Sequence, residues 1–385
     1  MATTKKPVKK SAVKTTAKKT VVKKFTTDQK AKDFIYAYLN NASPVGFEAS
    51  GQKIWLNYLR PYIDEVITDT YGTAVGVINP GQDYKVVIEA HSDEISWFVK
   101  FISEDGYIFI ERNGGSDHMI APSMRVNIHG DKGIVSGIFG WPAIHVRDLA
   151  KEETPNKNNI FIDVGAASKD EVIKMGIHVG TVITYVDGLM ELNNKYYVGR
   201  ALDNRLGGFV IAQVARRLKE NKVKLPYTLY VVNSVQEEIG LRGAEMISRR
   251  LKPDLAICTD VTHDTQSPVY NKRTLGDLGC GRGPVFGIGP AVHNNVLKFM
   301  TDIALKKKIP FQRQALARST GTDTDSFAYS AEGVASGLIS TPVKYMHTTV
   351  EMVKKSDVDL IIDLYYEILI ALKGNEDFGY LKSYK

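Results

Sequence analysis

Three short, mainly apolar segments constrain the fold more than any other feature, because each ends in acidic or histidine residues. They are VVIEA before His91, YVVNSVQ before Glu237 and LAICT before Asp260. Strands of this kind suit a sheet that is covered on both faces. In open α/β sheets, ligands collect outside the carboxyl ends of the parallel strands. We therefore expect the polar residues at these three ends to converge on one crevice.

A β-rich stretch interrupts this α/β pattern. At 385 residues the chain is long enough for two folded lobes. Residues 94–186 hold short strand-like segments with turn signals at close intervals. A β-rich stretch between two α/β segments indicates an inserted barrel-like domain. We expect an α/β domain in two parts, 26–93 and 187–385, with this insertion between them.

Helices are expected where apolar residues recur at helical spacing. Thr26 with Gln29 three positions later predicts a capping box for a first helix. Further helices are expected over 48–59, 206–218, 294–306 and 356–372. No run of 18 or more apolar residues occurs, so we expect no membrane-spanning helix.

The first 24 residues carry nine lysines and no acidic residue. Without these nine lysines the chain has 41 basic and 43 acidic side chains, which gives a net charge near −2. The net charge of the whole chain is +7. Residues 1–25 are expected to be a disordered, solvated tail. The alternative function for the tail is weak binding of nucleic acid through phosphate contacts.

Signals for secretion are missing from the sequence. No apolar stretch follows the lysines, as a secretory signal would require. The two cysteines, Cys258 and Cys280, have no spacing typical of a disulfide framework or a zinc knuckle. We expect a cytoplasmic protein with reduced thiols.

Two of the polar clusters offer a histidine and an aspartate as metal ligands. His91 at a strand end is expected to bind a metal through one ring nitrogen, while Asp93 orients the other nitrogen. Asp203 lies between Arg200 and Arg205 at the start of a helix. Helix N-capping explains Asp203 equally well, but a capping carboxylate can also bridge two cations with its two oxygens.

The remaining clusters supply two more carboxylates, a second imidazole and a base. Glu237 and Glu238 are adjacent acids that repel each other, so an ordinary fold gains nothing from them at a strand end. Alternation along the strand would let Glu238 bind a metal while Glu237 faces a water. Asp260 and His347 complete the set. His263 and Asp264 follow Asp260 closely but are not assigned as ligands.

Together these residues predict a site for two divalent metal ions per subunit. His91 and Asp260 would hold one ion and Glu238 and His347 the other, with Asp203 between them. Nitrogen and carboxylate ligands without thiolates suit Zn, the first choice, or Co or Mn. Such a pair activates a shared water, and Glu237 as general base would pass its proton to the leaving amine.

Several sequence strings resemble the tetrahedral aminopeptidase family, whose members are also called glutamyl or deblocking aminopeptidases. They are Ser43-Pro-Val-Gly-Phe-Glu48, His91-Ser-Asp-Glu-Ile95, Gly199-Arg-Ala-Leu-Asp-Asn-Arg205, Gln236-Glu-Glu-Ile-Gly-Leu-Arg-Gly243, Gly321-Thr-Asp323 and Tyr345-Met-His347. The resemblance spans nearly everything after residue 25.

The resemblance implies a phosphorylase/hydrolase-like three-layer α/β domain and makes the inserted β-rich domain a dimerisation domain. It also implies a homo-oligomer built from dimers, often a hollow tetrahedral dodecamer that trims peptides, and makes Asp93 and Glu237 the catalytic pair. Three features depart from the family pattern: the Lys-rich tail, Trp97 where a small residue is common, and Thr348 after His347 where a serine is usual.

The leading hypothesis is therefore a metal-dependent aminopeptidase acting on short peptides. One alternative is an endoglucanase-type glycosidase with paired carboxylates, which needs no metal and leaves the histidines without a role. Another is a nucleic-acid-associated protein that binds through its tail. For the free amino terminus of a peptide, Asp323 or Glu237 could serve as the acidic partner.

Overall fold

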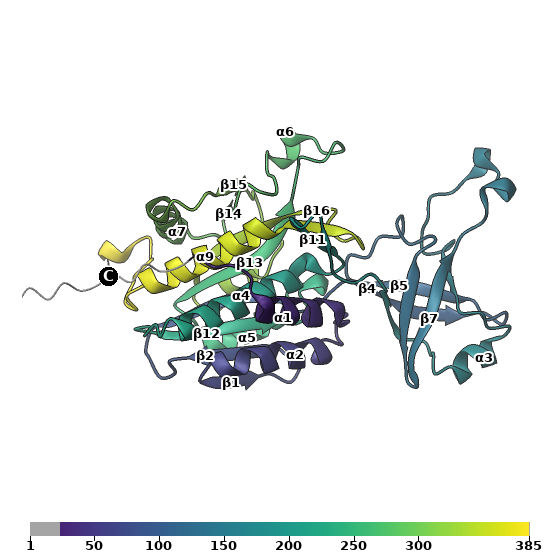
Figure 1. Ribbon diagram of the computed structural model, residues 1–385, viewed down its shortest axis with the longest axis horizontal. Helices are drawn as coiled ribbons and strands as arrows, with labels where there is room; N and C mark the ends of the chain where they lie inside the picture. The colour runs from purple at the N-terminus through teal and green to yellow at the C-terminus, as the bar shows by residue number, and fades with distance from the viewer. Residues whose placement is uncertain (1–23, 385) are drawn as a thin grey trace, which may run out of the picture.

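The computed structural model describes residues 24–384, and an 11-stranded sheet forms the centre of the larger part of that range (Figure 1). Its middle strands run parallel: β12 (Thr228–Ser234), β3 (Lys85–His91), β13 (Leu255–His263) and β16 (Ala335–Lys344). The other strands flank them: β1 (Glu65–Thr68), β2 (Ala74–Ile78), β17 (Glu351–Lys354), β11 (Tyr196–Gly199), β10 (Met190–Leu192), β14 (Val285–Ile288) and β15 (Gln312–Ala315).

Helices cover both faces of this sheet. The larger core includes buried residues of α1 (Gln29–Asn40), α2 (Ala49–Leu59), α4 (Leu202–Glu220), α7 (Asn294–Lys307) and α9 (Lys355–Ala371). The smaller core, on the opposite face, includes α5 (Arg242–Leu251) and α8 (Thr324–Ala328). Short helices complete the chain: η1 (Arg60–Tyr62), η2 (Ile144–Val146), η3 (Leu149–Lys151), α3 (Lys169–Lys174), η4 (Glu237–Ile239), α6 (Lys272–Leu275) and η5 (Lys382–Tyr384).

Strand alternation decides which side chains reach the edge where the polar clusters meet. In β3, Val86 belongs to the larger core and Val87 to the smaller one. His91 follows Val87 at an even spacing, so it lies on the same face of the sheet. Asp260 lies on that face as well, because β13 runs parallel to β3 and its residue Cys258 also belongs to the smaller core.

A closed six-stranded barrel follows β3 in the chain and projects from one end of the body (Figure 1). Its strands, in chain order, are β4 (Ser96–Ile102), β5 (Ile108–Asn113), β6 (Arg125–Gly130), β7 (Gly133–Gly140), β8 (Phe161–Asp163) and β9 (Val182–Tyr185). The barrel has its own core, with the fully buried Trp97 in it. The predicted three-layer α/β body with an inserted β-rich barrel is confirmed, whereas the exact domain limits stay predictions.

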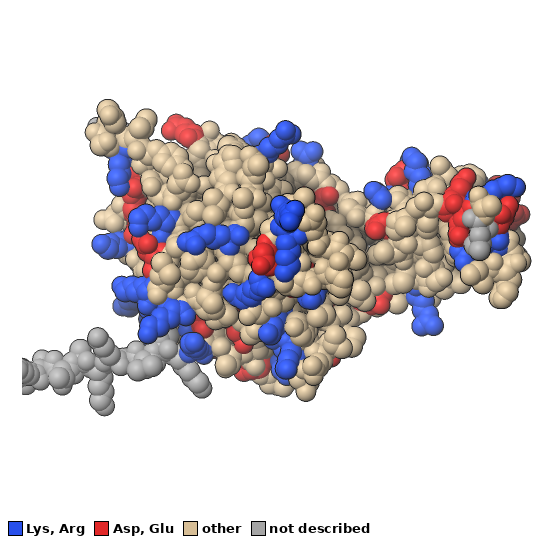
Figure 2. Space-filling model, turned by 90° about the horizontal axis from the view of Figure 1, so that it is seen from above, with Lys and Arg blue, Asp and Glu red and all other residues tan. Residues whose placement is uncertain are grey.

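The body and the barrel form an elongated molecule with a narrow connection between them (Figure 2). Basic and acidic side chains are interspersed over the body on the face shown there. None of the helices within 24–384 combines the length and the apolar character that a membrane crossing needs.

The start of α1 corrects one prediction. The helix begins at Gln29, and the side chain of Asp28 accepts a hydrogen bond from the Ala31 amide. The predicted capping box at Thr26 is therefore wrong, because Thr26 lies outside the first turn and a better cap follows it. Of the predicted disordered tail, residues 1–23 lie outside the described residues. The backbone amide of Phe25 donates to Asp363 in α9 at 2.9 Å.

Helix α4 is buried over most of its length in the larger core, so its packing should contribute strongly to the stability of the body. Phe209 in α4 is fully buried, whereas Phe47 is 51% exposed. We expect Phe209→Ala to lower the free energy of unfolding by about 3–5 kcal/mol and the control Phe47→Ala by less than about 1 kcal/mol. Denaturant unfolding measures both. Equal losses would show that α4 does not anchor the core.

Candidate active site

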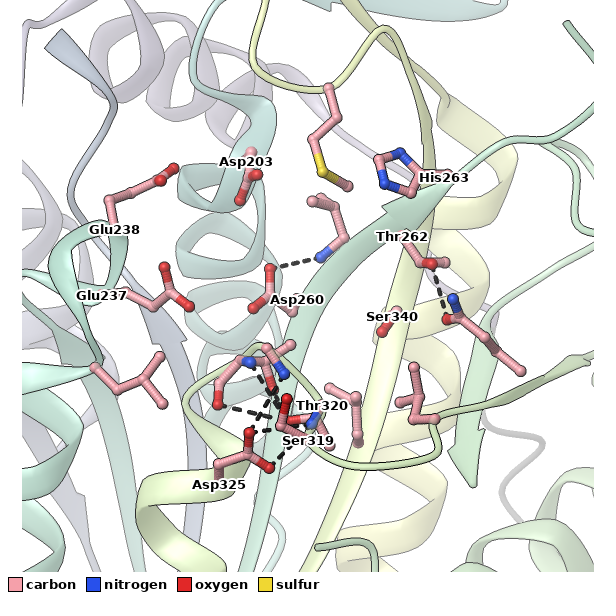
Figure 3. A pocket seen from close by; sticks show the side chains of 18 of the residues that line it. Asp203, Glu237, Glu238, Asp260, Thr262, His263, Ser319, Thr320, Asp325 and Ser340 are labelled. Carbon is pink, nitrogen blue, oxygen red and sulfur yellow. Dashed lines mark hydrogen bonds between the residues drawn. The ribbon is translucent and has the colours of Figure 1, made fainter. Parts of the chain in front are cut away.

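The predicted ligands meet in a cavity of about 600 Å³ at the carboxyl ends of the parallel strands (Figure 3). Asp203, Glu238, Asp260 and His347 line it, as does Glu237. His91 lies at the end of β3 with 2% exposure. The structure therefore brings together all five predicted ligands and the predicted base, although they are spread over 257 positions of sequence, from 91 to 347.

A single carboxylate contacts both imidazoles. Asp203 Oδ1 lies 3.2 Å from His91 Nε2, and Asp203 Oδ2 lies 3.1 Å from His347 Nε2. Asp203 is buried, with 7% exposure. Its two oxygens thus face two separate nitrogen donors, which is the arrangement expected of a ligand between two metal ions.

Each of the two imidazoles also lies near a further carboxylate. Glu238 Oε1 lies 3.3 Å from His347 Nε2, and Asp260 Oδ1 lies 4.0 Å from His91 Nε2. Glu237 Oε2 is 3.8 Å from the same His91 nitrogen. Donor atoms of His91, Glu237 and Asp260 lie close enough to share an ion, so Glu237 is a candidate ligand by proximity as well as a candidate base.

The two adjacent glutamates are not in a strand, contrary to the expectation from alternation. β12 ends at Ser234, Gln236 takes a left-handed conformation with φ 58°, and Glu237 and Glu238 lie in the short helix η4. This turn directs both side chains toward the cavity (Figure 3). Two acids can therefore serve one site without pointing to opposite faces of a sheet.

Asp93 holds the turn that carries the two glutamates. Its two carboxylate oxygens accept hydrogen bonds from the backbone amides of Glu237 and Glu238, at 3.0 and 3.1 Å. Asp93 Oδ1 also lies 3.4 Å from His91 Nδ1, although that nitrogen has no partner in hydrogen-bond geometry. Asp93 thus connects the end of β3 to η4.

The start of α4 also differs from the prediction. Ala201, with φ 60°, is the N-cap residue, and it makes no side-chain cap. Asp203 has non-helical angles of φ −79° and ψ 114°, and the peptide bond to Asn204 is cis. Asp203 is thus not the N-cap residue of α4. Helix capping therefore does not explain Asp203, and its carboxylate is free to face the imidazoles.

Sequence reasoning missed the role of Glu351, which holds two ligands at once. Its carboxylate accepts hydrogen bonds from the backbone amides of Asp203, at 3.0 Å, and His347, at 2.8 Å. Glu351 has 2% exposure. The only signal in the sequence was an acid four positions after His347, and surface loops produce that spacing often.

The barrel contacts the site through two glycines in the loop after β5. A Cβ atom on Gly115 would lie 2.4 Å from His347 Nδ1, and one on Gly114 would lie 3.2 Å from the Glu238 Cβ. Real Cβ contacts do not become as short as the first of these. The barrel backbone therefore packs directly against the His347 ring, and any larger residue at Gly115 would displace it.

Three other acidic or histidine residues that the sequence singled out have different places. His263 lines the cavity. Asp264 is buried and accepts hydrogen bonds from the amides of Gln266 and Cys280, which is a structural role. Asp323 has 3% exposure, accepts a hydrogen bond from the Ser234 hydroxyl and is not among the described residues that line the cavity.

The acids at the site raise the pKa of both imidazoles. Burial opposes the charged form of His347, but Asp203 and Glu238 outweigh it and raise its pKa to about 12. Burial likewise opposes charge on His91, and Glu237, Asp203 and Asp93 outweigh it and raise its pKa well above the usual value. Burial raises the pKa of Asp260. Crowded acids of this kind favour cations, either protons or metal ions.

The spacing of the donors fits ligands that share an ion. Two ligand atoms at the bond lengths of tetrahedral zinc are about 3.3 Å apart. The contacts of His91 with Asp203 and of His347 with Asp203 and Glu238 span 3.1–3.3 Å. The contact of His91 with Asp260 is longer, at 4.0 Å. Imidazole and carboxylate donors suit divalent transition metals. The residues present therefore fit a divalent metal centre.

Comparison with known proteins gives consistent matches. A family model described as M42 glutamyl aminopeptidase matches residues 72–364. The lysyl aminopeptidase of Pyrococcus furiosus is 33% identical over 85% of this chain and 93% of its own. The TET aminopeptidase structure from the marine sediment archaeon Thaumarchaeota archaeon SCGC AB-539-E09 has a TM-score of 0.85 at 26% identity, covering 90% of this chain and 98% of that one.

A third relative shares the fold at lower identity. The Pyrococcus horikoshii TET1 peptidase, described as assembling into a tetrahedron or a large octahedral shell, has a TM-score of 0.79 at 22% identity, covering 89% of this chain and all of that one.

The two bonds of Glu351 lead to a stability prediction. Glu351→Ala would leave the buried amides of Asp203 and His347 without an acceptor, at about 1–3 kcal/mol for each. Glu351→Gln keeps one acceptor oxygen and should cost less. Thermal unfolding of the metal-free protein should place the midpoints in the order wild type, Glu351→Gln, Glu351→Ala. An unchanged midpoint for the alanine variant would contradict this role.

Proposed function

The chain belongs to the M42 glutamyl aminopeptidase family and is a peptide hydrolase, and we propose that it removes N-terminal residues from short peptides at a dinuclear metal site. The observation that carries this proposal is the Asp203 carboxylate, whose two oxygens face His91 and His347 at 3.2 and 3.1 Å. Burying a carboxylate and two imidazoles is costly in an ordinary core, whereas these groups are typical ligands of a metal site.

The proposed ligands divide into two sets. His91 and Asp260 would hold one divalent ion, and Glu238 and His347 the other, with Asp203 common to both. Zn is the first choice, and Co or Mn are the alternatives for the same donors. When bound, two such ions supply Lewis acidity, which activates water and polarises a peptide carbonyl group.

Glu237 is the proposed general base. It lines the cavity beside His91, and η4 directs its carboxylate into that space (Figure 3). From there it can accept a proton from the attacking water and deliver it to the leaving amine. Asp93 is proposed as its positioning partner, because its bonds to the amides of Glu237 and Glu238 fix the turn.

The free amino group of the substrate needs an acidic partner near the metal ions. Asp323 is a poor candidate because it is buried and bonded to Ser234. Glu237 lines the cavity, but we assign it as the general base, so we name no partner for the amino group.

Assembly and location are further parts of the proposal. We propose a homo-oligomer built from dimers through the barrel and extending to a tetrahedral dodecamer, which the TET likenesses support. We also propose a cytoplasmic location, in agreement with the free thiols of Cys258 and Cys280.

The comparisons do not favour the glycosidase alternative, since the family and the relatives named above are peptidases. The nucleic-acid alternative depends on a tail that lies outside the described residues. It offers no reason for the ligand set to be assembled.

Removal of the base should separate catalysis from metal binding. Glu237→Gln keeps the size of the side chain but removes the proton acceptor, so we expect kcat to fall about 10²–10⁴-fold with the metal content unchanged. Asp203→Ala is the matched comparison, and it should lose metal as well as activity. Elemental analysis and cleavage of leucine p-nitroanilide measure the two effects. Normal turnover by Glu237→Gln would show that another group is the base.

Metal removal should distinguish the peptidase from the glycosidase mechanism. We expect chelation to abolish peptide hydrolysis, and two zinc ions per chain to restore it, because the five ligands divide into two sets. A glycosidase with two carboxylates needs no metal. Hydrolysis of a β-glucan that survives chelation, or peptide hydrolysis by metal-free protein, would contradict the proposal.

A further inference from the structure

The cavity beside the proposed metal ligands has a wall that can contact the N-terminal side chain of a peptide. This wall extends from Thr262 on one side to Thr320 and Asp325 on the other (Figure 3). Gln314, which is bonded to Thr262, also lines it. Apolar side chains such as Leu316 complete it. The volume, about 600 Å³, leaves room for a large side chain next to the scissile bond.

The polar groups of this wall are neutral or negative. Of the described residues that line the cavity, none is a lysine or an arginine. Asp325 contributes a carboxylate, which accepts hydrogen bonds from the amides of Thr320 and Gly321. Burial lowers the pKa of His263, so this imidazole also favours its neutral form.

Gln314 supplies the most adaptable polar group in the wall. Its Oε1 accepts a hydrogen bond from the Thr262 hydroxyl at 2.8 Å, and its amide group lies on β15 at the side of the cavity. An amide can hydrogen-bond a neutral side chain, but it cannot neutralise a carboxylate. Burying an unpaired carboxylate is expensive, and a nearby like charge adds to that cost.

We infer that this enzyme cleaves peptides whose N-terminal side chain is neutral or basic and discriminates against those that begin with glutamate or aspartate. The inference rests on the proposed function of the same site. It also implies that the glutamyl activity in the name of the family does not extend to this chain. Arg318 is exposed in the loop before Ser319 but is not among the lining residues.

A test compares substrates that differ in charge but little in shape. The full-length, zinc-loaded protein is assayed with the p-nitroanilides of leucine, glutamine, glutamate and lysine. We expect kcat/KM for the glutamine substrate to exceed that for glutamate by at least about tenfold, with lysine within about tenfold of glutamine. Equal values for glutamine and glutamate in an active enzyme would overturn the inference alone. Cleavage of none of the four would overturn the proposed function and this inference with it.

Variants of Gln314 test the wall directly. Gln314→Lys places a cation in the cavity and should raise the glutamate-to-glutamine ratio of kcat/KM about tenfold, whereas Gln314→Met has a similar length without charge and should leave that ratio unchanged. An unchanged ratio in Gln314→Lys would show that the substrate side chain does not contact this wall, and it would overturn the inference. The inference is also wrong if the wild type cleaves the glutamate substrate well and Arg318→Ala abolishes this cleavage. In that case Arg318 binds the glutamate carboxylate.

Discussion

One buried carboxylate, that of Asp203, contacts two imidazoles, and these two contacts set the geometry of the site. Asp203 comes from the first turn of α4, His91 from the end of β3 and His347 from the segment after β16. Both contacts persist only if these elements keep fixed positions relative to one another. The packing of α4 over the parallel strands, with Phe209 fully buried, supplies that rigidity.

The inserted barrel is in direct contact with the proposed metal site. Asp93 stands just before the barrel and bonds to the turn of Glu237, while Gly115 packs on the ring of His347. The turn that carries Glu237 and the ring of His347 are therefore both held by the inserted segment or the residues next to it. Movement of the barrel relative to the body would be transmitted to His347, so assembly through the barrel would also constrain the site.

The sequence predicted much of this arrangement, because apolar strands that end in ligand-type residues carry their own signal. The strand ends at His91 and Asp260 were predicted to converge on one crevice, whereas their place on one sheet face follows from the pairing of β3 with β13. The local geometry of Asp203 and of Glu237 could not be predicted from the sequence, because a left-handed residue before each of them breaks the regular helix or strand pattern. Glu351 was missed because its bond to Asp203 joins residues 148 positions apart, and such contacts leave no local pattern.

We propose that two divalent ions share Asp203. Diffraction from crystals grown with zinc, measured on both sides of the zinc absorption edge, tests it directly. We expect two anomalous peaks in the cavity, one beside His91 and Asp260 and the other beside Glu238 and His347, each within bonding distance of an Asp203 oxygen. A single peak, or zinc held away from Asp203 by other residues, would contradict the claim.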